Sequence, residues 1–320
     1  MRAVRFHEHG DDSVLRVDEI DRPEAAPDEV LVEVAAAGVN PVDTYFREGS
    51  YEPYGLPAIP GVDAAGEAVA VGDAVEGVAA GDAVFATGLS STMPGGYAEY
   101  VAVPDDRLAT LPTSADLVAA GGAGVAAVTA WRALIQHASL RPAETVLIHG
   151  GSGGVGHAAV QVAAATGARV LATAAPQYHD AVEALGADAV FDYAREELTD
   201  AVTTAVDGDG VDVILDHRLD EYLGFDAEVA GHGARVVGIG ENDPAIGLPA
   251  SAAARGKDLN LRLMSMFNTP SLADALADLG SLWGDDLGIE VADSYDLAEA
   301  AAAQRAVMTE SFLGKLVVEP

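Results

Sequence analysis

The stretch that most constrains the fold of this chain is residues 143–175. An apolar, β-branched run at 145–148 leads into GSGGVG at 151–156, which fits the pattern G-x-G-x-x-G. A segment of small residues follows at 157–165, and a second apolar run occupies 169–173. This order predicts a β-α-β unit: a buried strand, a glycine turn, a helix and a second strand parallel to the first.

The glycine turn predicts a nucleotide site. Glycines let the backbone turn tightly and approach a pyrophosphate, and the free N–H groups of a helix N-terminus favour an anion. The chain has 35 glycines, so the pattern alone is weak, and a plain tight connection is the alternative. Here, however, a strand precedes the turn and a helix follows it, with Gly167 as its expected C-cap. We therefore expect the cofactor to contact Gly151, Ser152, Gly153, Gly154, Val155 and Gly156.

The composition predicts a globular protein. Half of the 320 residues are apolar and the mean hydropathy is +0.19, which is enough for two domains or one large one. The chain has no cysteine, so disulfides, thiolate catalysis and cysteine-bound zinc are excluded. No apolar run approaches the length of a membrane span, and the first residues do not read as a secretion signal. We expect a soluble cytoplasmic protein.

The charge is extreme. Asp and Glu number 51 against 17 Lys and Arg, a formal net charge of −34. Such a chain repels nucleic acid and anionic membranes. Because the apolar content argues against disorder, we interpret the charge as an acidic surface, as in organisms with molar intracellular salt, where a screening length of about 3 Å at 1 M quenches self-repulsion. An acidic partner-binding face is the alternative, but the charges are spread along the chain.

The rest of the chain suggests two kinds of module. The first third reads as antiparallel strands, expected at 3–6, 15–17, 29–34, 66–72, 82–85 and 95–101. From about residue 115 helices alternate with strands, a pattern typical of a doubly wound parallel sheet. The strands of that sheet are expected at 145–148, 169–173, 189–192, 211–215 and 234–239. A helix at 271–283 and a strand at 314–318 could return to the first module. The expected fold class is α/β, with a β-barrel domain and a Rossmann-type sheet.

Several short motifs add a family resemblance. They are Gly38-Val39-Asn40-Pro41-Val42-Asp43-Thr44-Tyr45 with Arg47, Gly49 and Tyr51, then Pro57 to Asp63, Thr129-Ala130-Trp131, Gln161, and Gly314-Lys315-Leu316-Val317. On these residues the chain resembles the zinc-free quinone oxidoreductase (zeta-crystallin-like) branch of the medium-chain dehydrogenase/reductase superfamily, over essentially its whole length. The resemblance implies a GroES-like catalytic domain from 1–124 and 268–320 and a Rossmann domain from 125–267. It also implies a cleft where nicotinamide meets substrate, and a homodimer, which we expect to form through Rossmann edge strands near 234–250.

The sister branch, the zinc alcohol dehydrogenases, bears on the question of a metal. Matching its G-x-C-x-T-D and G-H-E patterns places Asn40 at the cysteine, Val42 at the threonine, Val62 at the histidine and Asp63 at the glutamate. A neutral amide and a valine cannot hold a tetrahedral zinc, and the histidines show no convincing ligand spacing. We expect no metal. Without a Lewis acid the acceptor must take hydride without strong polarisation, as quinones and activated enones do.

We place Asn40, Tyr45 and Tyr51 along the substrate pocket. Their amide and phenol groups can donate to a carbonyl oxygen, and the aromatic rings can stack on a planar acceptor. Loop packing and backbone capping are the alternative for all three. Asp43 is expected to be structural, bonding the amides of its own turn. Thr129, matched to the family's Thr-Ala, is expected to touch the nicotinamide, with a helix-interior hydrogen bond to a carbonyl as the alternative.

The end of the second strand indicates the cofactor. NAD sites usually carry an acidic residue there, but this chain has Thr173-Ala174-Ala175-Pro176, so NADPH is favoured and NADH is the alternative. Thr173 and Ala174 are expected to contact the cofactor. The family's Ser-Ser and lysine are missing, and Tyr178 or His179 stands where the lysine would be. Tyr193 matches a family tyrosine that borders the adenosine phosphate. Further cofactor contacts are expected at Gly238, Lys315 and Phe267, the last of which core packing would explain equally well. Arg218 could reach a phosphate or pair with Glu221.

The leading functional hypothesis is a zinc-independent NADPH:quinone oxidoreductase that acts by direct hydride transfer on a small molecule. The first alternative is an enoyl-thioester reductase of the same superfamily. With 17 basic residues, however, the chain offers no obvious cationic groove for a phosphopantetheine or coenzyme A phosphate. The second alternative is a non-catalytic NADPH-binding protein, which the glycine turn and the tyrosine-containing segment argue against.

Overall fold

The computed structural model describes residues 1–206, 208–249 and 251–320 of this chain. It divides into two compact units. The first unit comprises Met1–Val128 and Pro270–Pro320, and the second comprises Thr129–Thr269. That the first unit is a catalytic domain and the second a cofactor-binding domain stays a proposal.

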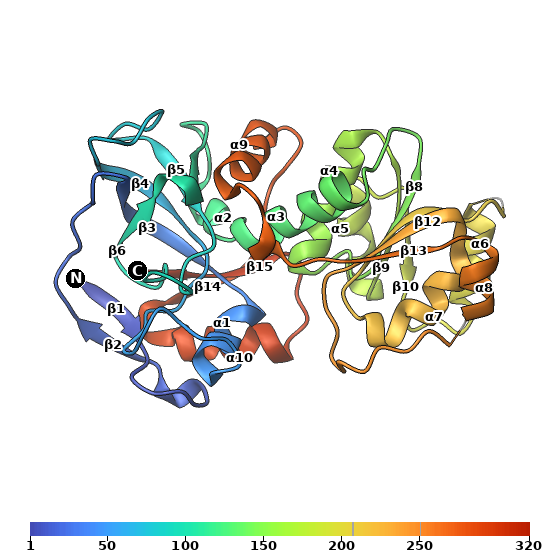
Figure 1. Ribbon diagram of the computed structural model, residues 1–320, viewed down its shortest axis with the longest axis horizontal. Coiled ribbons are helices and arrows are strands. Elements are labelled where there is room, and N and C mark those ends of the chain that lie inside the picture. The colour runs from blue at the N-terminus through green and yellow to red at the C-terminus, as the bar shows by residue number, and fades with distance from the viewer. Residues whose placement is uncertain (207, 250) are drawn as a thin grey trace. The chain divides into compact units, whose positions relative to one another are not determined.

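The first unit is built on a mostly antiparallel sheet whose strands come from residues 29–110 and from the C-terminal residues 291–319 (Figure 1). The sheet order is β14-β15-β3-β4-β5-β7, β6 also pairs with β3, and β1 and β2 form a separate ribbon. The strands are β1 (Arg2–Arg5), β2 (Arg16–Glu19), β3 (Glu29–Val39), β4 (Ala64–Val71), β5 (Ala83–Ala86), β6 (Tyr100–Pro104), β7 (Leu108–Thr110), β14 (Val291–Asp296) and β15 (Lys315–Glu319).

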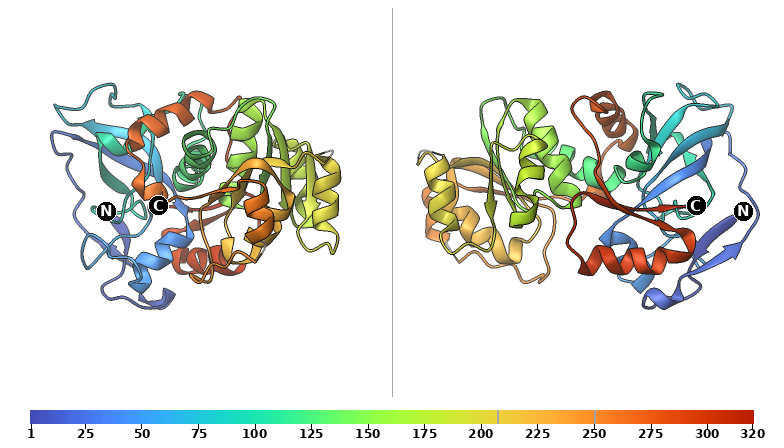
Figure 2. Two further views of the ribbon diagram at one scale, coloured as in Figure 1. Left: turned by 45° about the vertical axis from the view of Figure 1, so that its right-hand side comes forward. Right: turned by 180° about the vertical axis from the view of Figure 1, so that it is seen from behind.

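Short helices flank this sheet. Figures 1 and 2 show α1 and α10 side by side, and the two helices are in contact. The helices are α1 (Pro41–Glu48), α2 (Leu117–Gly121), α3 (Gly124–Trp131, which runs into the second unit), α9 (Leu272–Leu282) and α10 (Ala300–Thr309), with 3₁₀ turns η1 (Asp12–Val14), η2 (Asp105–Arg107) and η6 (Leu297–Glu299). The expected helix at 271–283 is confirmed as α9.

The second unit is a parallel sheet of six strands in the order β10-β9-β8-β11-β12-β13. Its strands are β8 (Thr145–Ile148), β9 (Arg169–Ala174), β10 (Ala189–Asp192), β11 (Val211–Asp216), β12 (Ala230–Gly238) and β13 (Asn260–Leu263). The connecting helices are η3 (Arg132–His137, a π-helix), α4 (Gly154–Thr166), η4 (Pro176–Tyr178), α5 (His179–Ala184), α6 (Leu198–Ala205), α7 (Leu219–Val229), α8 (Ser251–Gly256) and η5 (Met266–Asn268). The expected α/β fold, which combines an antiparallel module with a parallel sheet, is confirmed.

Two sequence predictions were wrong in position. The expected strand at 95–101 is β6, which begins at Tyr100, because Gly95 and Gly96 instead bond to the carbonyls of Ile59 and Gly61. The expected edge of the parallel sheet near 234–250 is also wrong, since β12 is paired on both sides. The edge is β13, a strand of four residues that the sequence did not reveal.

No helix within the described residues is both long enough and apolar enough to cross a membrane.

Candidate cofactor site and candidate active site

The glycine turn joins β8 to α4 and leaves no room for a side chain at Gly151 or Gly156. Gly150 has a φ of +67°, a region that favours glycine. A Cβ added to Gly156 would lie 1.9 Å from the carbonyl oxygen of Gly150, and one on Gly151 would lie 2.9 Å from the Cβ of Ala172. Gly156 therefore packs directly on the backbone of Gly150, and Gly151 packs closely on β9, as close helix–strand packing requires.

The first turn of α4 suits an anion. Gly153 is the N-cap and has no side chain to accept from the helix amides, so the N–H groups that follow it are left for a ligand. The helix begins at Gly154, three residues before the predicted start, because the end of the glycine pattern forms its first turn. It ends with Gly167 in a left-handed conformation (φ +81°), which confirms the predicted C-cap. These features fit the pyrophosphate of a dinucleotide.

The predicted adenosine contacts lie at neighbouring strand ends. Thr173 and Ala174 are buried at the end of β9, and the Thr173 Oγ1 accepts from the Gly150 N–H at 3.2 Å. His179 folds back so that its Nε2 lies 3.1 Å from the Ala174 carbonyl oxygen. Tyr178 is half-buried, while Tyr193, directly after β10, is 49% exposed. Because Asp192 pairs with Ala174 in the sheet, Tyr193 follows the neighbouring strand end.

The other predicted cofactor residues are spread over the second unit. Gly238 ends β12, and a Cβ there would lie 2.1 Å from the Cδ1 atom of Leu219, so a larger residue would have to displace that side chain. Thr129 is buried within α3, and Phe267, on η5, is 40% exposed. The sequence left open whether Arg218 reaches a phosphate or pairs with Glu221, and in the structure it pairs with Glu221.

In the first unit, Asn40 and Lys315 lie in a buried polar cluster. The Lys315 ammonium donates to the Asn40 Oδ1 and to the Val39 carbonyl oxygen, both at 2.6 Å. The Asn40 Nδ2 donates to the Asp63 Oδ2 at 2.8 Å and faces the Gly38 carbonyl oxygen at 3.4 Å. Asn40, Asp63 and Lys315 are all less than 5% exposed. We call these three side chains the Lys315 cluster.

Further hydrogen bonds fix this cluster. The Asp63 Oδ1 accepts from the Thr87 hydroxyl at 2.6 Å and from the Val125 N–H at 2.9 Å. Asp43 accepts from the N–H groups of Asn40 and Val62, at 2.8 and 2.9 Å, which confirms its expected structural role. Burial raises the pKa of Asp43 to about 7 and also raises the pKa of Asp63. The Lys315 charge opposes both of these shifts. Burial lowers the pKa of Lys315, while both carboxylates oppose that shift.

These residues do not fit a zinc ion. Asn40 and Val62 stand where the zinc alcohol dehydrogenases have cysteine and histidine, and the Asn40 oxygen already accepts from an ammonium. A cation at that oxygen would meet the Lys315 charge at close range, which is unfavourable in a buried site. Within the described part of the chain, no group of three or more His, Cys, Asp or Glu side chains could hold a metal.

Tyr45 and Tyr51 form an aromatic pair next to this cluster in sequence. Tyr45 lies on α1, a helix that the sequence did not predict, which Pro41 begins and Gly49 ends with a φ of +85°. The Tyr51 N–H donates to the Tyr45 carbonyl at 3.1 Å, and the two rings meet edge to face with centroids 5.8 Å apart. Tyr45 is half-buried and Tyr51 is 48% exposed. Tyr51 therefore presents much of its side chain to solvent.

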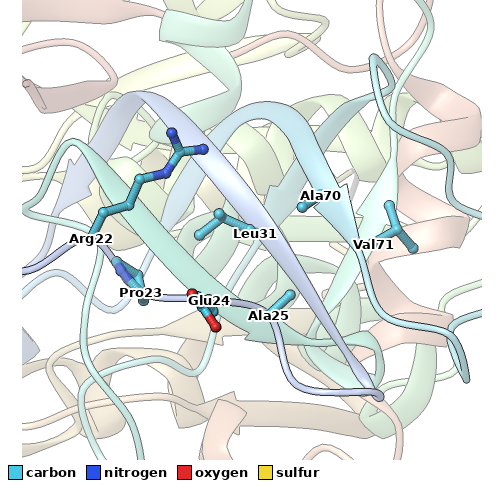
Figure 3. A pocket seen from close by; sticks show the side chains of 7 residues that line it. All are labelled: Arg22, Pro23, Glu24, Ala25, Leu31, Ala70 and Val71. Atoms are coloured by element: carbon cyan, nitrogen blue, oxygen red, sulfur yellow. The ribbon is translucent and has the colours of Figure 1, made fainter.

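A pocket of about 510 Å³ lies elsewhere in the first unit. Its lining comes from the segment before β3 and from β3 and β4, and none of the predicted site residues belongs to it (Figure 3). The residues that line it are Arg22, Pro23, Glu24, Ala25, Leu31, Ala70 and Val71. The guanidinium of Arg22 lies 3.9 Å above the Tyr100 ring, and we assign this pocket no role.

Sequence reasoning missed three buried side chains next to the glycine turn. They are His149, Asp216 and Asp226, of which the two carboxyls come from β11 and α7. His149 stands directly before the turn and Asp216 is the last residue of a strand, and these positions were the available signals. No sequence pattern pointed to Asp226, which is 77 residues from the histidine that it contacts.

Comparison with known proteins adds the following. Two family models match: the alcohol dehydrogenase GroES-like domain over residues 26–113 and the zinc-binding dehydrogenase over residues 185–318. Human quinone oxidoreductase is 40% identical over 244 residues, which are 75% of this chain and 73% of that protein. Escherichia coli quinone oxidoreductase complexed with NADPH has a TM-score of 0.87 and 27% identity, with all of both chains covered. An NAD-dependent alcohol dehydrogenase has a TM-score of 0.92 and 28% identity, also with both chains fully covered.

Proposed function

Because the chain belongs to the quinone oxidoreductase family of the medium-chain dehydrogenase/reductase superfamily, we propose that it reduces quinones or related conjugated carbonyl compounds with NADPH. The observation that carries the proposal is a combination within one chain. A glycine turn fit for a dinucleotide is present, and an ammonium group lies against Asn40, at a position where a zinc enzyme needs a metal ligand. Hydride transfer without a metal suits conjugated acceptors.

The second unit supplies most of the proposed cofactor contacts. The turn at 151–156 and the N-terminus of α4 would hold the pyrophosphate. The strand end at Thr173 and Ala174 lacks a carboxylate, which supports NADPH, and Tyr178 and Tyr193 would border its adenosine phosphate. When bound, the nicotinamide supplies the hydride. Thr129, Gly238 and Phe267 would contact the nicotinamide half of the cofactor. Lys315 would act on the same half through Asn40.

The first unit would supply the substrate contacts. Tyr45 and Tyr51 offer phenol donors to the carbonyl oxygen on which charge develops, and their rings offer a face for a planar acceptor. Asn40 contributes its second N–H, which the Gly38 carbonyl oxygen holds only weakly at 3.4 Å. Lys315 and Asp63 fix the orientation of that amide from both ends. The final proton would come from a tyrosine or from solvent.

The proposal is tested by oxidation of NADPH and, separately, NADH by the purified protein in about 2 M KCl, since self-repulsion of the acidic surface strains the fold in dilute buffer. The panel contains quinones, conjugated enones and a short enoyl thioester. We expect turnover of quinones with kcat/KM at least about tenfold higher for NADPH. A preference for NADH would contradict the cofactor assignment. Turnover of the thioester alone, or tight NADPH binding without turnover, would contradict the quinone assignment.

In the same assay, Tyr51→Phe keeps the ring and removes the hydroxyl. We expect kcat to fall about tenfold, below the loss for a buried oxyanion donor because Tyr51 is 48% exposed, with little change in KM. Tyr100→Phe is the matched control, because its hydroxyl bonds the exposed Glu33 on the same unit. Equal rates for both variants would remove Tyr51 from the proposed active site.

We also propose a homodimer that pairs β13 with its copy. This edge strand exposes Leu261 and Leu263, by 45% and 63%, and an unpaired edge with exposed leucines favours association. Light scattering after size exclusion in about 2 M KCl should give twice the chain mass of 32.6 kDa. Leu263→Asp should give the monomer mass, and Leu248→Asp, in the loop after β12, should not. A monomeric wild-type protein would contradict the proposal.

The charge of −34 supports a small-molecule substrate rather than a nucleic acid or a membrane surface. A cytoplasmic location and a salt-rich working environment belong to the same proposal. Among the described residues, the fully buried carboxyls are Asp43, Asp63, Asp216 and Asp226. Most of the remaining acidic charge therefore faces solvent, where salt screens it.

A further inference from the structure

A buried chain of polar contacts leads from α7 to the glycine turn. His149 follows β8 directly, and its Nε2 lies 2.9 Å from the Asp226 Oδ1, with both side chains at most 1% exposed. On the other side of the ring, Nδ1 lies 3.4 Å from the Thr173 Oγ1. That hydroxyl oxygen accepts from the Gly150 N–H at 3.2 Å. Three contacts thus connect Asp226 to the backbone of the turn.

A second carboxyl joins this chain. Asp216, the last residue of β11, hydrogen-bonds to Asp226, and its Oδ1 accepts from the Arg218 N–H at 2.7 Å. Across the parts of the chain that the structure describes, no N–H or hydroxyl group donates to the Oδ2 atom of either carboxyl. Two buried carboxyls in contact hold a shared proton, because like charges at that distance do not both ionise readily. We call Asp216, Asp226, His149 and Thr173 the His149 network.

The titration of these groups follows their burial. Burial raises the pKa of Asp216 to about 7, and the charge of Asp226 adds to this shift. Burial also raises the pKa of Asp226 to about 8. Burial lowers the pKa of His149 to about 4, so its ring is neutral at pH 7. The neutral ring donates from Nε2 to Asp226 and accepts at Nδ1 from the Thr173 hydroxyl.

Other polar groups face the network from the same elements. His217 lies against Gly150, and burial, then His149 and Arg218, lower its pKa to about 4. Tyr222 of α7 stacks on His149 with ring centroids 4.6 Å apart, and burial raises its pKa. The Arg218 guanidinium is held by Glu221, which is exposed. None of these groups takes over the role of the proton that the Asp216 and Asp226 carboxyls share.

We propose that Asp226, together with Asp216, is a positioning residue for the cofactor: the proton that they share holds His149, Thr173 and the glycine turn in the arrangement that binds NADPH. The inference rests on the proposed NADPH binding. When the proton leaves, two adjacent buried carboxylates repel each other, and the added negative charge opposes the pyrophosphate. If His149 takes up the proton instead, its Nδ1 becomes a donor and the Thr173 hydroxyl must turn away. Either change weakens the connection to the turn.

The test is the pH dependence of the Kd for NADPH, measured by fluorescence titration from about pH 6.5 to about pH 9 in about 2 M KCl. We expect the wild-type Kd to rise at least about fivefold over this range. In Asp226→Asn the amide oxygen still accepts from His149 and the amide N–H still donates to Asp216, with or without a proton on Asp216, so two adjacent carboxylates cannot form at any pH. For this variant we expect a change below about twofold. The 2′-phosphate of NADPH titrates near pH 6 and affects both proteins equally.

Asp200→Asn is the matched control, because it removes the same charge from an exposed position on α6 of the same unit. It should keep the wild-type ratio of Kd values. A flat wild-type profile overturns the inference even if Asp226→Asn does not fold, and so does a profile of Asp226→Asn as steep as that of the wild type. A wild-type protein that binds no NADPH at any pH overturns the proposed function, and the inference with it.

Discussion

Replacing Lys315 by methionine is expected to destabilise the first unit by about 3–5 kcal/mol near neutral pH, the usual cost of removing one partner of a buried ion pair. The ammonium is 2.6 Å from both of its acceptors, and its charge opposes the shifts that burial imposes on Asp43 and Asp63. Methionine fills a similar volume but leaves the Asp63 charge without a buried cation. Urea unfolding followed by circular dichroism measures the change.

The loss should depend on pH. Asp63 already has a raised pKa in the folded protein, and removing Lys315 raises it further. A carboxyl that holds its proton more tightly when folded loses stability as pH rises above its unfolded pKa, so the variant should be closer to wild type at about pH 5 than at about pH 8. The chain contains one other lysine, Lys257, whose Nζ donates to two backbone carbonyls at the end of α7.

Lys257→Met is therefore a matched control with the same change of side chain and charge, and it should cost less than about 1 kcal/mol. A second substitution, Asp63→Asn, should restore part of the stability lost in Lys315→Met, because it removes the uncompensated charge. Equal losses for the two lysine variants would show that the Lys315 charge is not needed in the cluster. The same conclusion would follow if Asp63→Asn restored none of the stability that Lys315→Met loses.

The β-α-β unit was predictable because its signals are local. The apolar runs that became β8 and β9, the glycines between them and the C-cap at Gly167 act over a few residues each. The helix α1 was not predicted because it has only eight residues and begins inside a motif that resembles a loop. Its start at Pro41 and end at Gly49 are the signals that could have revealed it.

The contacts within the Lys315 cluster and the His149 network could not be predicted from the sequence, because they join distant parts of the chain. Lys315 reaches Asn40 across 275 residues, and the cause is the antiparallel pairing of β15 with β3, which places Leu316 opposite Val39. Sequence patterns name both residues, but they contain no information on that register. The same holds for His149 and Asp226, which meet because α7 packs against β11, the neighbour of β8 in the sheet. Burial and pairing, which create these clusters, are properties of the folded chain.

Gly156→Ala is expected to weaken NADPH binding at least about a hundredfold, which corresponds to about 2.8 kcal/mol of binding free energy. The new Cβ would lie 1.9 Å from the Gly150 carbonyl oxygen, which also accepts from the Gly153 N–H at 2.9 Å. The turn must open to relieve that contact, and the amides at the start of α4 then lose their arrangement. Fluorescence titration measures the affinity, and circular dichroism checks that the variant is folded.

Gly153→Ala separates binding from folding at the same turn. Gly153 has ordinary extended dihedral angles, φ −75° and ψ 172°, and an added Cβ would meet only the Gly150 oxygen, at 3.4 Å. The protein alone thus tolerates the methyl group, whereas a pyrophosphate that approaches the backbone here does not. We expect wild-type stability with at least about tenfold weaker NADPH binding. Gly256→Ala, whose Cβ would meet no atom within 4 Å, is the control. Wild-type affinity in Gly153→Ala would place the pyrophosphate away from this turn.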